Sequence, residues 1–160
     1  MSPLQIKFQS EIGPIFLVAS EKGLHGVYWK EMKIEYAMPK TQGTAMDILK
    51  ETQKQLEQYL KGQRKVFDLP LDATGTDFQK RVWLELSKIP YGKTFSYSEI
   101  AKKIQNDRAV RAVGTANGRN PISLIVPCHR VIAADGTLGG YAGGLEIKEK
   151  LLRLEQSGSL

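Results

Sequence analysis

The sequence predicts an α+β protein in two parts: a small N-terminal antiparallel sheet with a helix, then a mostly helical C-terminal part that contains a helix-turn-helix. Three observations support this prediction. Apolar and polar residues alternate near the N-terminus at the two-residue period of a strand. From residue 76 onward apolar residues recur at helical spacing, and a stretch containing Pro and Gly separates the two patterns.

The first thirty residues are predicted to form antiparallel strands. Three segments carry alternating or continuous apolar side chains and are therefore expected to be extended. They are residues 4–8, 15–19 and 24–29. Turns are expected between them at residues 13–14 and 21–23, where glycine and proline or charged residues gather. Residues 31–43 are polar and are expected to be irregular.

A helix is predicted to begin at Thr44. Thr44 and Asp47 resemble a capping box in which Asp replaces the usual Glu or Gln. Apolar residues recur at helical spacing up to Leu60, and Gly62 is expected to stop the helix. A short extended piece is expected at residues 66–71.

The stretch Pro70 to Gly75 is predicted to be a linker because it combines proline, glycine and small polar residues. It separates an N-terminal α/β domain, residues 1–72, from a C-terminal helical domain, residues 76–160.

The C-terminal part carries two capping boxes, Thr76 with Gln79 and Ser96 with Glu99, each of which predicts the start of a helix. A third helix is expected from about residue 108 to 117, after a short polar turn. Two short helices joined in this way form a helix-turn-helix, a pattern that also arises often by chance.

The third helix has one polar face, on which Arg108, Arg111 and Thr115 lie at helical spacing. Alanine occupies much of the remainder, and side chains this small let a helix backbone approach a surface closely. A narrow minor groove requires such an approach, so we favour minor-groove docking over the usual major-groove placement. Tight packing inside the domain explains the alanines equally well, and the sequence leaves both readings open.

Charge and hydropathy limit the partners. The formal net charge is +6, and basic residues clearly outnumber acidic ones in residues 73–130. This excess suits a polyanion such as nucleic acid, although ordinary surface charge explains it too. No run of about 18 apolar residues is present, so we expect no transmembrane helix. We also expect no signal peptide, since the N-terminus lacks a basic region followed by an apolar stretch.

Cys128 is the only cysteine in 160 residues. It therefore forms no internal disulfide and belongs to no cysteine-cluster zinc site. It lies within Pro-Cys-His-Arg, and cationic or imidazole neighbours are expected to lower the pKa of a thiol. The proline fixes the backbone of a rigid turn. The alternative is a buried cysteine that behaves as a small apolar side chain.

Two downstream features complete the candidate site. Glu155 lies at the edge of the apolar stripe of a C-terminal helix, where it would form a Cys-His-Glu arrangement with Cys128 and His129. The residues alone favour the alternative, a helix-end glutamate that reaches water. Between His129 and Glu155 in the sequence, residues 135–144 form a glycine-rich loop. The loop lacks a Walker lysine pattern, which argues against phosphate binding. Its Tyr141 could stack on a flat ligand or pack on the core.

These motifs together resemble one known family. Pro-Cys-His-Arg at residues 127–130, preceded by Asn-Pro at 120–121 and followed by Tyr-Ala-Gly-Gly at 141–144, resembles the 6-O-alkylguanine-DNA alkyltransferases. The resemblance extends through residues 76–160, and the N-terminal half fits only in general shape, which in this family is ribonuclease-H-like. It implies direct-reversal DNA repair, with base flipping from the minor groove and one irreversible transfer of an alkyl group from the 6-oxygen of guanine to the protein. The 4-oxygen of thymine is left open as a second target.

The resemblance also implies roles for individual residues. Cys128 is the implied nucleophile and alkyl acceptor, His129 its base through a bridging water, and Glu155 the residue that orients His129. Asn120 is implied to brace the active-site turn. The implied DNA- and base-binding residues include one that donates a hydrogen bond to the guanine ring, one that fills the gap in the duplex, and the walls of the base pocket. They are Tyr97, Arg111, Arg130, Val131, Tyr141, Ala142 and Gly143.

The implied partner is double-stranded DNA that contains alkylated guanine, with no cofactor and no membrane. Some relatives bind zinc in the first domain through cysteines and histidines, but only His25 is available here, so we expect no metal. Ser123 replaces a proline that lines the alkyl pocket in some relatives, which leaves the range of alkyl groups open. A cytoplasmic, nucleoid-associated monomer is expected, with clustering along DNA left open.

Two alternatives compete with alkyl transfer. A sensor that binds alkylated DNA without chemistry would not need Cys128. A cysteine hydrolase would leave the basic helix-turn-helix without a purpose.

Overall fold

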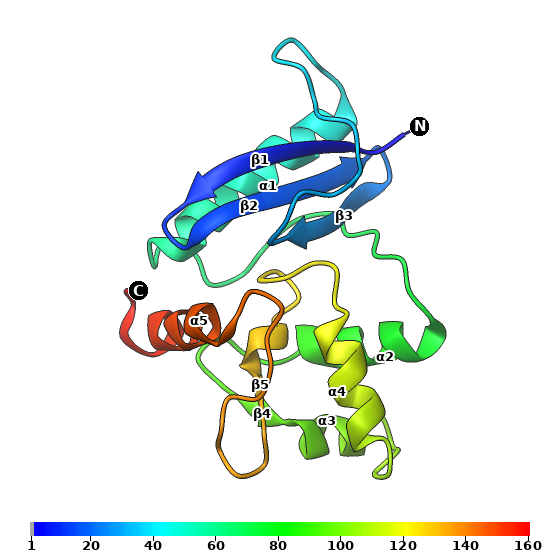
Figure 1. Ribbon diagram of the computed structural model, residues 1–160, viewed down its shortest axis with the longest axis vertical. Helices are drawn as coiled ribbons and strands as arrows, with labels where there is room; N and C mark the ends of the chain where they lie inside the picture. Colours follow the sequence, from blue (N-terminus) through cyan, green and yellow to red (C-terminus); the bar gives the residue numbers. More distant parts are fainter. Residues whose placement is uncertain (1) are drawn as a thin grey trace. The chain divides into compact units, whose positions relative to one another are not determined.

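The computed structural model describes residues 2–160 and confirms the α+β class. The chain divides into two compact units, the first ending at Thr74 and the second beginning at Gly75. The N-terminal unit holds the antiparallel sheet, and the C-terminal unit is mostly helical (Figure 1).

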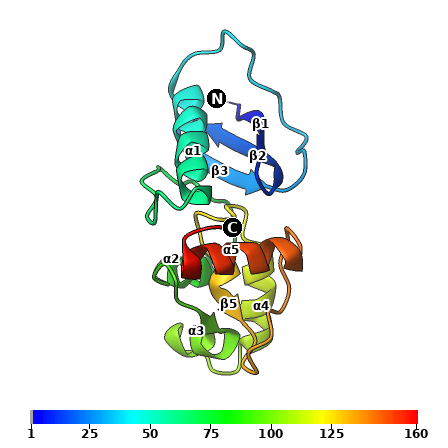
Figure 2. The same cartoon turned by 90° about the vertical axis from the view of Figure 1, so that its left-hand side faces the viewer.

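The sheet of the first unit has the order β1-β2-β3 and is antiparallel throughout. Its strands are β1 (Leu4–Ser10), β2 (Gly13–Ser20) and β3 (Gly23–Tyr28). Residues 15–20 of β2 are all buried, which explains their continuous rather than alternating apolar pattern. α1 (Thr44–Leu60) packs on one face of the sheet, and the connection from β3 to α1 passes on the other side (Figure 2).

One local prediction in this unit is wrong. Gly43, not Thr44, is the N-cap of α1, and no side chain caps the helix, so the expected capping box is absent. The expected extended piece at residues 66–71 contacts the sheet through an isolated bridge between Leu71 and Leu24, and Val66 is exposed. Backbone hydrogen bonds of Leu24 with Pro70 and Asp72 hold that bridge.

The second unit contains α2 (Asp77–Ser87), α3 (Tyr97–Lys103), α4 (Val110–Gly118) and α5 (Leu145–Ser157). Both predicted capping boxes are confirmed, at Thr76 with Gln79 and at Ser96 with Glu99. A short parallel pair, β4 (Phe95–Ser96) with β5 (Val131–Ile132), connects the start of α3 to the chain that follows the Pro-Cys-His-Arg motif. The relation of α3 to α4 as a DNA-binding helix-turn-helix stays a prediction.

Within residues 2–160, no helix is both long enough and apolar enough to cross a membrane.

Candidate active site around Cys128

Cys128 is the first residue of a short 3-10 helix, η1 (Cys128–Arg130), and Pro127 lies at its N-cap. Its side chain borders a cavity of about 190 Å³. The cavity collects residues from α3, α4, η1 and the glycine-rich loop. Its lining is Tyr97, Gly114, Asn117, Gly118, Asn120, Cys128, Gly140, Tyr141 and Ala142. Cys128 is only 4% exposed, so a reacting molecule must enter this cavity to meet the sulfur.

Asn120 holds the turn that leads to Cys128. Its Oδ1 accepts a hydrogen bond from the Ile122 amide at 3.0 Å, and its Nδ2 donates to the Val126 carbonyl at 2.8 Å. Between these two contacts, Leu124 has a φ of 72°, which is rare for a branched side chain. Such backbone persists only where surrounding contacts impose it, and Asn120 supplies two of them.

His129 and Arg130 both meet Glu155 of α5. His129 is fully buried, and its Nε2–H donates to Glu155 Oε2 at 2.7 Å. Arg130 donates from Nε to Oε1 at 2.8 Å and from its second terminal nitrogen to Oε2 at 3.0 Å. The Gly92 amide adds a bond to Oε1 at 3.1 Å. The Glu155 side chain is 1% exposed, so the alternative of a glutamate reaching water is wrong.

Burial sets the protonation states of Cys128 and His129. Desolvation raises the pKa of the Cys128 thiol, although a hydrogen bond from Asn120 and the charge of Lys148 act in the opposite direction. The thiol therefore rests protonated near neutral pH, contrary to the lowered pKa expected from its sequence neighbours. Desolvation also lowers the pKa of His129, despite the opposing effect of Glu155. A neutral imidazole bonded to a carboxylate through Nε2–H is able to take up a proton at Nδ1.

Lys148 is a site residue that the sequence reasoning missed. Its side chain is fully buried, and Nζ donates to the Val131 carbonyl at 2.7 Å, to the Leu138 carbonyl and to the Gly140 carbonyl at 3.2 Å. Desolvation lowers the pKa of Lys148 to about 8. These contacts join the chain after η1 to the glycine-rich loop. Its position three residues before Leu151, on the buried face of α5, is the signal that could have revealed it.

The predicted site residues divide into two groups. The cavity brings together Tyr97, Asn120, Cys128, Tyr141 and Ala142. The other predicted residues do not line it. Arg111 is exposed on α4, Val131 is buried in β5, Gly143 follows the lining segment, and Arg130 is held by Glu155 and by the Ile89 carbonyl at 2.7 Å.

The structure bears in part on two alternatives that the sequence left open, one for the alanines of α4 and one for Tyr141. On α4, Ala116 is buried whereas Ala112 is exposed, so packing and an open small-residue surface coexist. Tyr141 packs against the core: its ring meets that of His129 edge-on, with centroids 6.5 Å apart. Burial raises the pKa of Tyr141 well above the usual value, and Ser123 is hydrogen-bonded to its hydroxyl.

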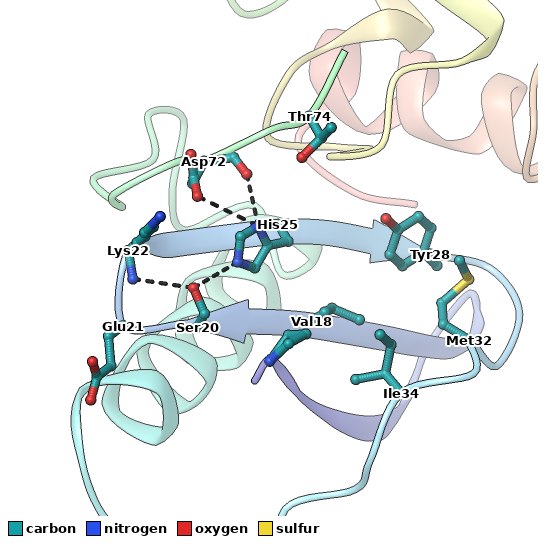
Figure 3. A pocket seen from close by; sticks show the side chains of 11 residues that line it. Val18, Ser20, Glu21, Lys22, His25, Tyr28, Met32, Ile34, Asp72 and Thr74 are labelled. Atoms are coloured by element: carbon teal, nitrogen blue, oxygen red, sulfur yellow. Dashed lines mark hydrogen bonds and ion pairs between the residues drawn. The ribbon is translucent and has the colours of Figure 1, made fainter. Parts of the chain in front are cut away.

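A larger cavity, of about 520 Å³, lies in the first unit. Figure 3 shows His25 between Ser20 and Asp72 at one end of it. His25 Nδ1–H donates to the Asp72 carbonyl at 2.9 Å, and Nε2 accepts from the Ser20 hydroxyl at 2.7 Å. Ser20 also accepts a bond from the Lys22 amide at 3.2 Å. Within residues 2–160, no group of three or more histidine, cysteine or acidic side chains could hold a metal ion.

Known proteins resemble both units. The family model "6-O-methylguanine DNA methyltransferase, DNA binding domain" matches residues 77–157, and "6-O-methylguanine DNA methyltransferase, ribonuclease-like domain" matches residues 4–73. The methylated-DNA–protein-cysteine methyltransferase of Methanosarcina acetivorans is 52% identical over 150 residues, covering 94% of this chain and 96% of that protein. Its namesake from Mycobacterium tuberculosis is 58% identical over 103 residues, covering 64% and 62%.

A solved structure resembles the whole fold. The crystal structure of Mycobacterium tuberculosis OGT in complex with DNA superposes with a TM-score of 0.85 and 41% sequence identity, covering 99% of this chain and 95% of that one.

Proposed function

This chain belongs to the 6-O-methylguanine DNA methyltransferase family, and we propose that Cys128 is the residue that receives the methyl group. Its activity is that of a methylated-DNA–protein-cysteine methyltransferase that acts in DNA repair. The substrate is double-stranded DNA containing alkylated guanine, and the protein acts as a monomer that needs no cofactor.

One observation carries this proposal: the chain's single thiol borders a cavity, and the residue that follows it in sequence is a buried neutral histidine that a carboxylate holds in one orientation. An adjacent base that is itself oriented by a third group is the general arrangement for activating a nucleophile. Asn120 and Lys148 favour the thiolate once the proton has left, since both lower the pKa of Cys128.

The reaction begins when the Cys128 thiol gives up its proton, through a bridging water, to His129 Nδ1. The Nε2–H of His129 keeps its hydrogen bond to Glu155. The sulfur then attacks the methyl carbon, so a carbon–sulfur bond forms as the bond from carbon to the 6-oxygen breaks. The guanine keeps the electron pair and regains one proton, so the thiol proton ends on the base. Tyr97 lines the cavity, and we assign to its hydroxyl the hydrogen bond donated to the leaving ring.

The base must leave the duplex to reach Cys128, because the buried sulfur borders a cavity that a base held within the helical stack cannot enter. Arg111 is exposed on α4 and is the proposed side chain that fills the gap from the minor-groove side. Ala112, also exposed beside it, allows the close approach of the helix that this groove requires. Arg130 is not available for this task, because Glu155 holds its guanidinium.

The methylated product is a thioether, and no group at the site would release it, so each molecule reacts once. The same chemistry extends to the 4-oxygen of alkylated thymine if that base fits the cavity.

The experiment is to mix the protein with one equivalent of duplex DNA containing 6-O-methylguanine and to measure intact and peptide masses. We expect a gain of one methyl group on the Cys128 peptide, and no gain with Cys128→Ser, which should still bind the DNA. Tight binding with an unchanged mass would contradict transfer and support a lesion sensor.

A further inference from the structure

Asn117 has a buried hydrogen-bond acceptor that meets no donor within the described residues 2–160. It lies on α4, is 4% exposed and borders the same cavity as Cys128. Its Nδ2 donates to the Cys128 carbonyl at 3.4 Å. Its Oδ1 has no hydrogen-bond partner among residues 2–160.

The orientation of this amide is fixed by the bond it makes. If the amide were turned over, Oδ1 would face the Cys128 carbonyl and two acceptors would oppose each other. Oδ1 must therefore stay on the other side of the amide. A buried acceptor without a donor is costly, and native proteins rarely keep one without a reason. A ligand with a hydrogen-bond donor would remove that cost when it enters the cavity.

The proposed substrate carries one suitable donor. Alkylation of the 6-oxygen removes the proton from guanine N1, so the exocyclic 2-amino group is the donor left on the pairing edge of the base. Thymine alkylated on its 4-oxygen has lost its N3 proton in the same way and offers no donor on that edge. The two lesions thus differ in whether they offer the hydrogen-bond donor that Asn117 Oδ1 lacks.

We propose that Asn117 Oδ1 accepts a hydrogen bond from the 2-amino group of the flipped guanine and thereby selects guanine over thymine lesions. This inference rests on the proposed function of Cys128. A site with a buried polar group rejects an analogue that leaves the group unpaired far better than it rejects a change in apolar bulk. One unsatisfied acceptor corresponds to a rate difference of about 10- to 100-fold.

The test compares two bases that differ only in this amino group. Single-turnover rates of methyl transfer are measured on duplexes with 6-O-methylguanine and with 6-O-methylhypoxanthine, which lacks the 2-amino group. The wild-type protein is expected to prefer guanine by about 10- to 100-fold. In Asn117→Leu, which is similar in size but forms no hydrogen bond, the ratio should fall to near one through a slower guanine reaction. Asn106→Leu, an exposed asparagine before α4, should keep the wild-type ratio.

The wild-type ratio keeps the proposal testable even if Asn117→Leu folds poorly, and Asn117→Ala provides a second variant. A wild-type ratio near one, or an unchanged ratio in Asn117→Leu, would overturn the role of Asn117 while leaving methyl transfer intact. An equal loss on both bases would also overturn it, because Asn117 would then act on Cys128 rather than on the substrate. Failure of Cys128 to gain a methyl group from either base would instead overturn the proposed function, and this inference with it.

Discussion

Each unit combines a histidine with a nucleophilic side chain and an acidic residue, yet the two arrangements differ in what surrounds them. In the first unit, His25 lies between Ser20 and Asp72. Its Nδ1 bonds the backbone carbonyl of Asp72 at 2.9 Å, whereas the carboxylate stays 3.7 Å away with a side chain 43% exposed. In the second unit, the carboxylate itself bonds the histidine at 2.7 Å and is 1% exposed.

The difference shows that proximity of three residue types does not make a catalytic site. An exposed carboxylate is screened by water, and a carbonyl dipole stabilises an imidazolium less than a desolvated negative charge does. Buried Glu155 also holds Arg130 and Gly92, so its two oxygens are fixed by several groups at once. We therefore assign chemistry to the second arrangement and a structural role to the first, where His25 joins β3 to the segment that contains Asp72.

Exchanging the nucleophiles should give the largest effect. Cys128→Ser should reduce methyl transfer by at least about a thousandfold, since an alcohol is a far weaker nucleophile near neutral pH. Adding Ser20→Cys to that variant should not restore transfer, although the new thiol would lie beside His25. Methyl transfer measured by peptide mass would decide this, and a methyl group at position 20 would contradict the comparison.

Removing the carboxylate beside each histidine should give the second-largest difference between the two units. Glu155→Gln leaves Arg130 buried without its counter-charge and should lower the free energy of unfolding by about 3–5 kcal/mol. It should also slow transfer by about 100-fold, because His129 loses its stabilising partner. Urea unfolding and single-turnover rates measure the two effects.

Asp72→Asn is the matched control for Glu155→Gln. It retains the backbone carbonyl that bonds His25, so stability should change by less than about 1 kcal/mol and the transfer rate should not change. Equal losses in the two variants would mean that the buried carboxylate has no special role.

Acid should reveal which histidine matters. His129 has a pKa below its usual 6.5, so it is neutral at pH 7 and becomes protonated only as the pH falls through that lowered value. Transfer should therefore be constant near neutrality and then fall about tenfold per pH unit below the pKa of His129.

The free energy of unfolding should decline as the pH falls from 6.5 to the pKa of His129 in the folded protein, because the unfolded chain binds a proton that the folded chain does not.

Rates of methyl transfer measured between pH 8 and pH 4.5, in wild type and in His25→Gln, should share one profile. A pH profile of transfer that changes in His25→Gln would show that His25 takes part in the reaction, contrary to the role assigned to His129.

Ser20→Ala should give the smallest effect. It removes one hydrogen bond to His25 and should lower the free energy of unfolding by about 1 kcal/mol, or Tm by roughly 2–4 °C. Transfer by Cys128 should be unchanged. Calorimetry and the single-turnover assay test this, and a slower reaction would show that the first arrangement serves the chemistry.

Local signals in the sequence predicted most of the fold. The strands followed from apolar patterning, and two helix starts followed from capping boxes whose bonds are confirmed at Thr76 and Ser96. The capping box at Thr44 failed because Gly43, with a φ of 115°, occupies the N-cap instead. The extended piece expected at residues 66–71 pairs through a single bridge at Leu71, a long-range contact that its local pattern did not reveal.

The site was harder to predict, since its decisive contacts join residues far apart in the chain. Adjacency of Cys128 to His129 and Arg130 was visible, but the burial that raises the thiol pKa was not. Whether Glu155 reached water or His129 depended on how α5 packs. Lys148 was overlooked because a lysine is usually assigned to the surface, whereas here three carbonyls satisfy its charge. The roles given to the individual site residues stay predictions.

Counting methyl groups under excess substrate tests the central claim most directly. The protein is incubated with a tenfold excess of DNA containing 6-O-methylguanine, and methyl groups gained per molecule are counted and located by peptide mass. We expect one methyl group per molecule, on Cys128, with the remaining lesions untouched. Repair of more than one lesion per molecule, or a methyl group on any other residue, would contradict it.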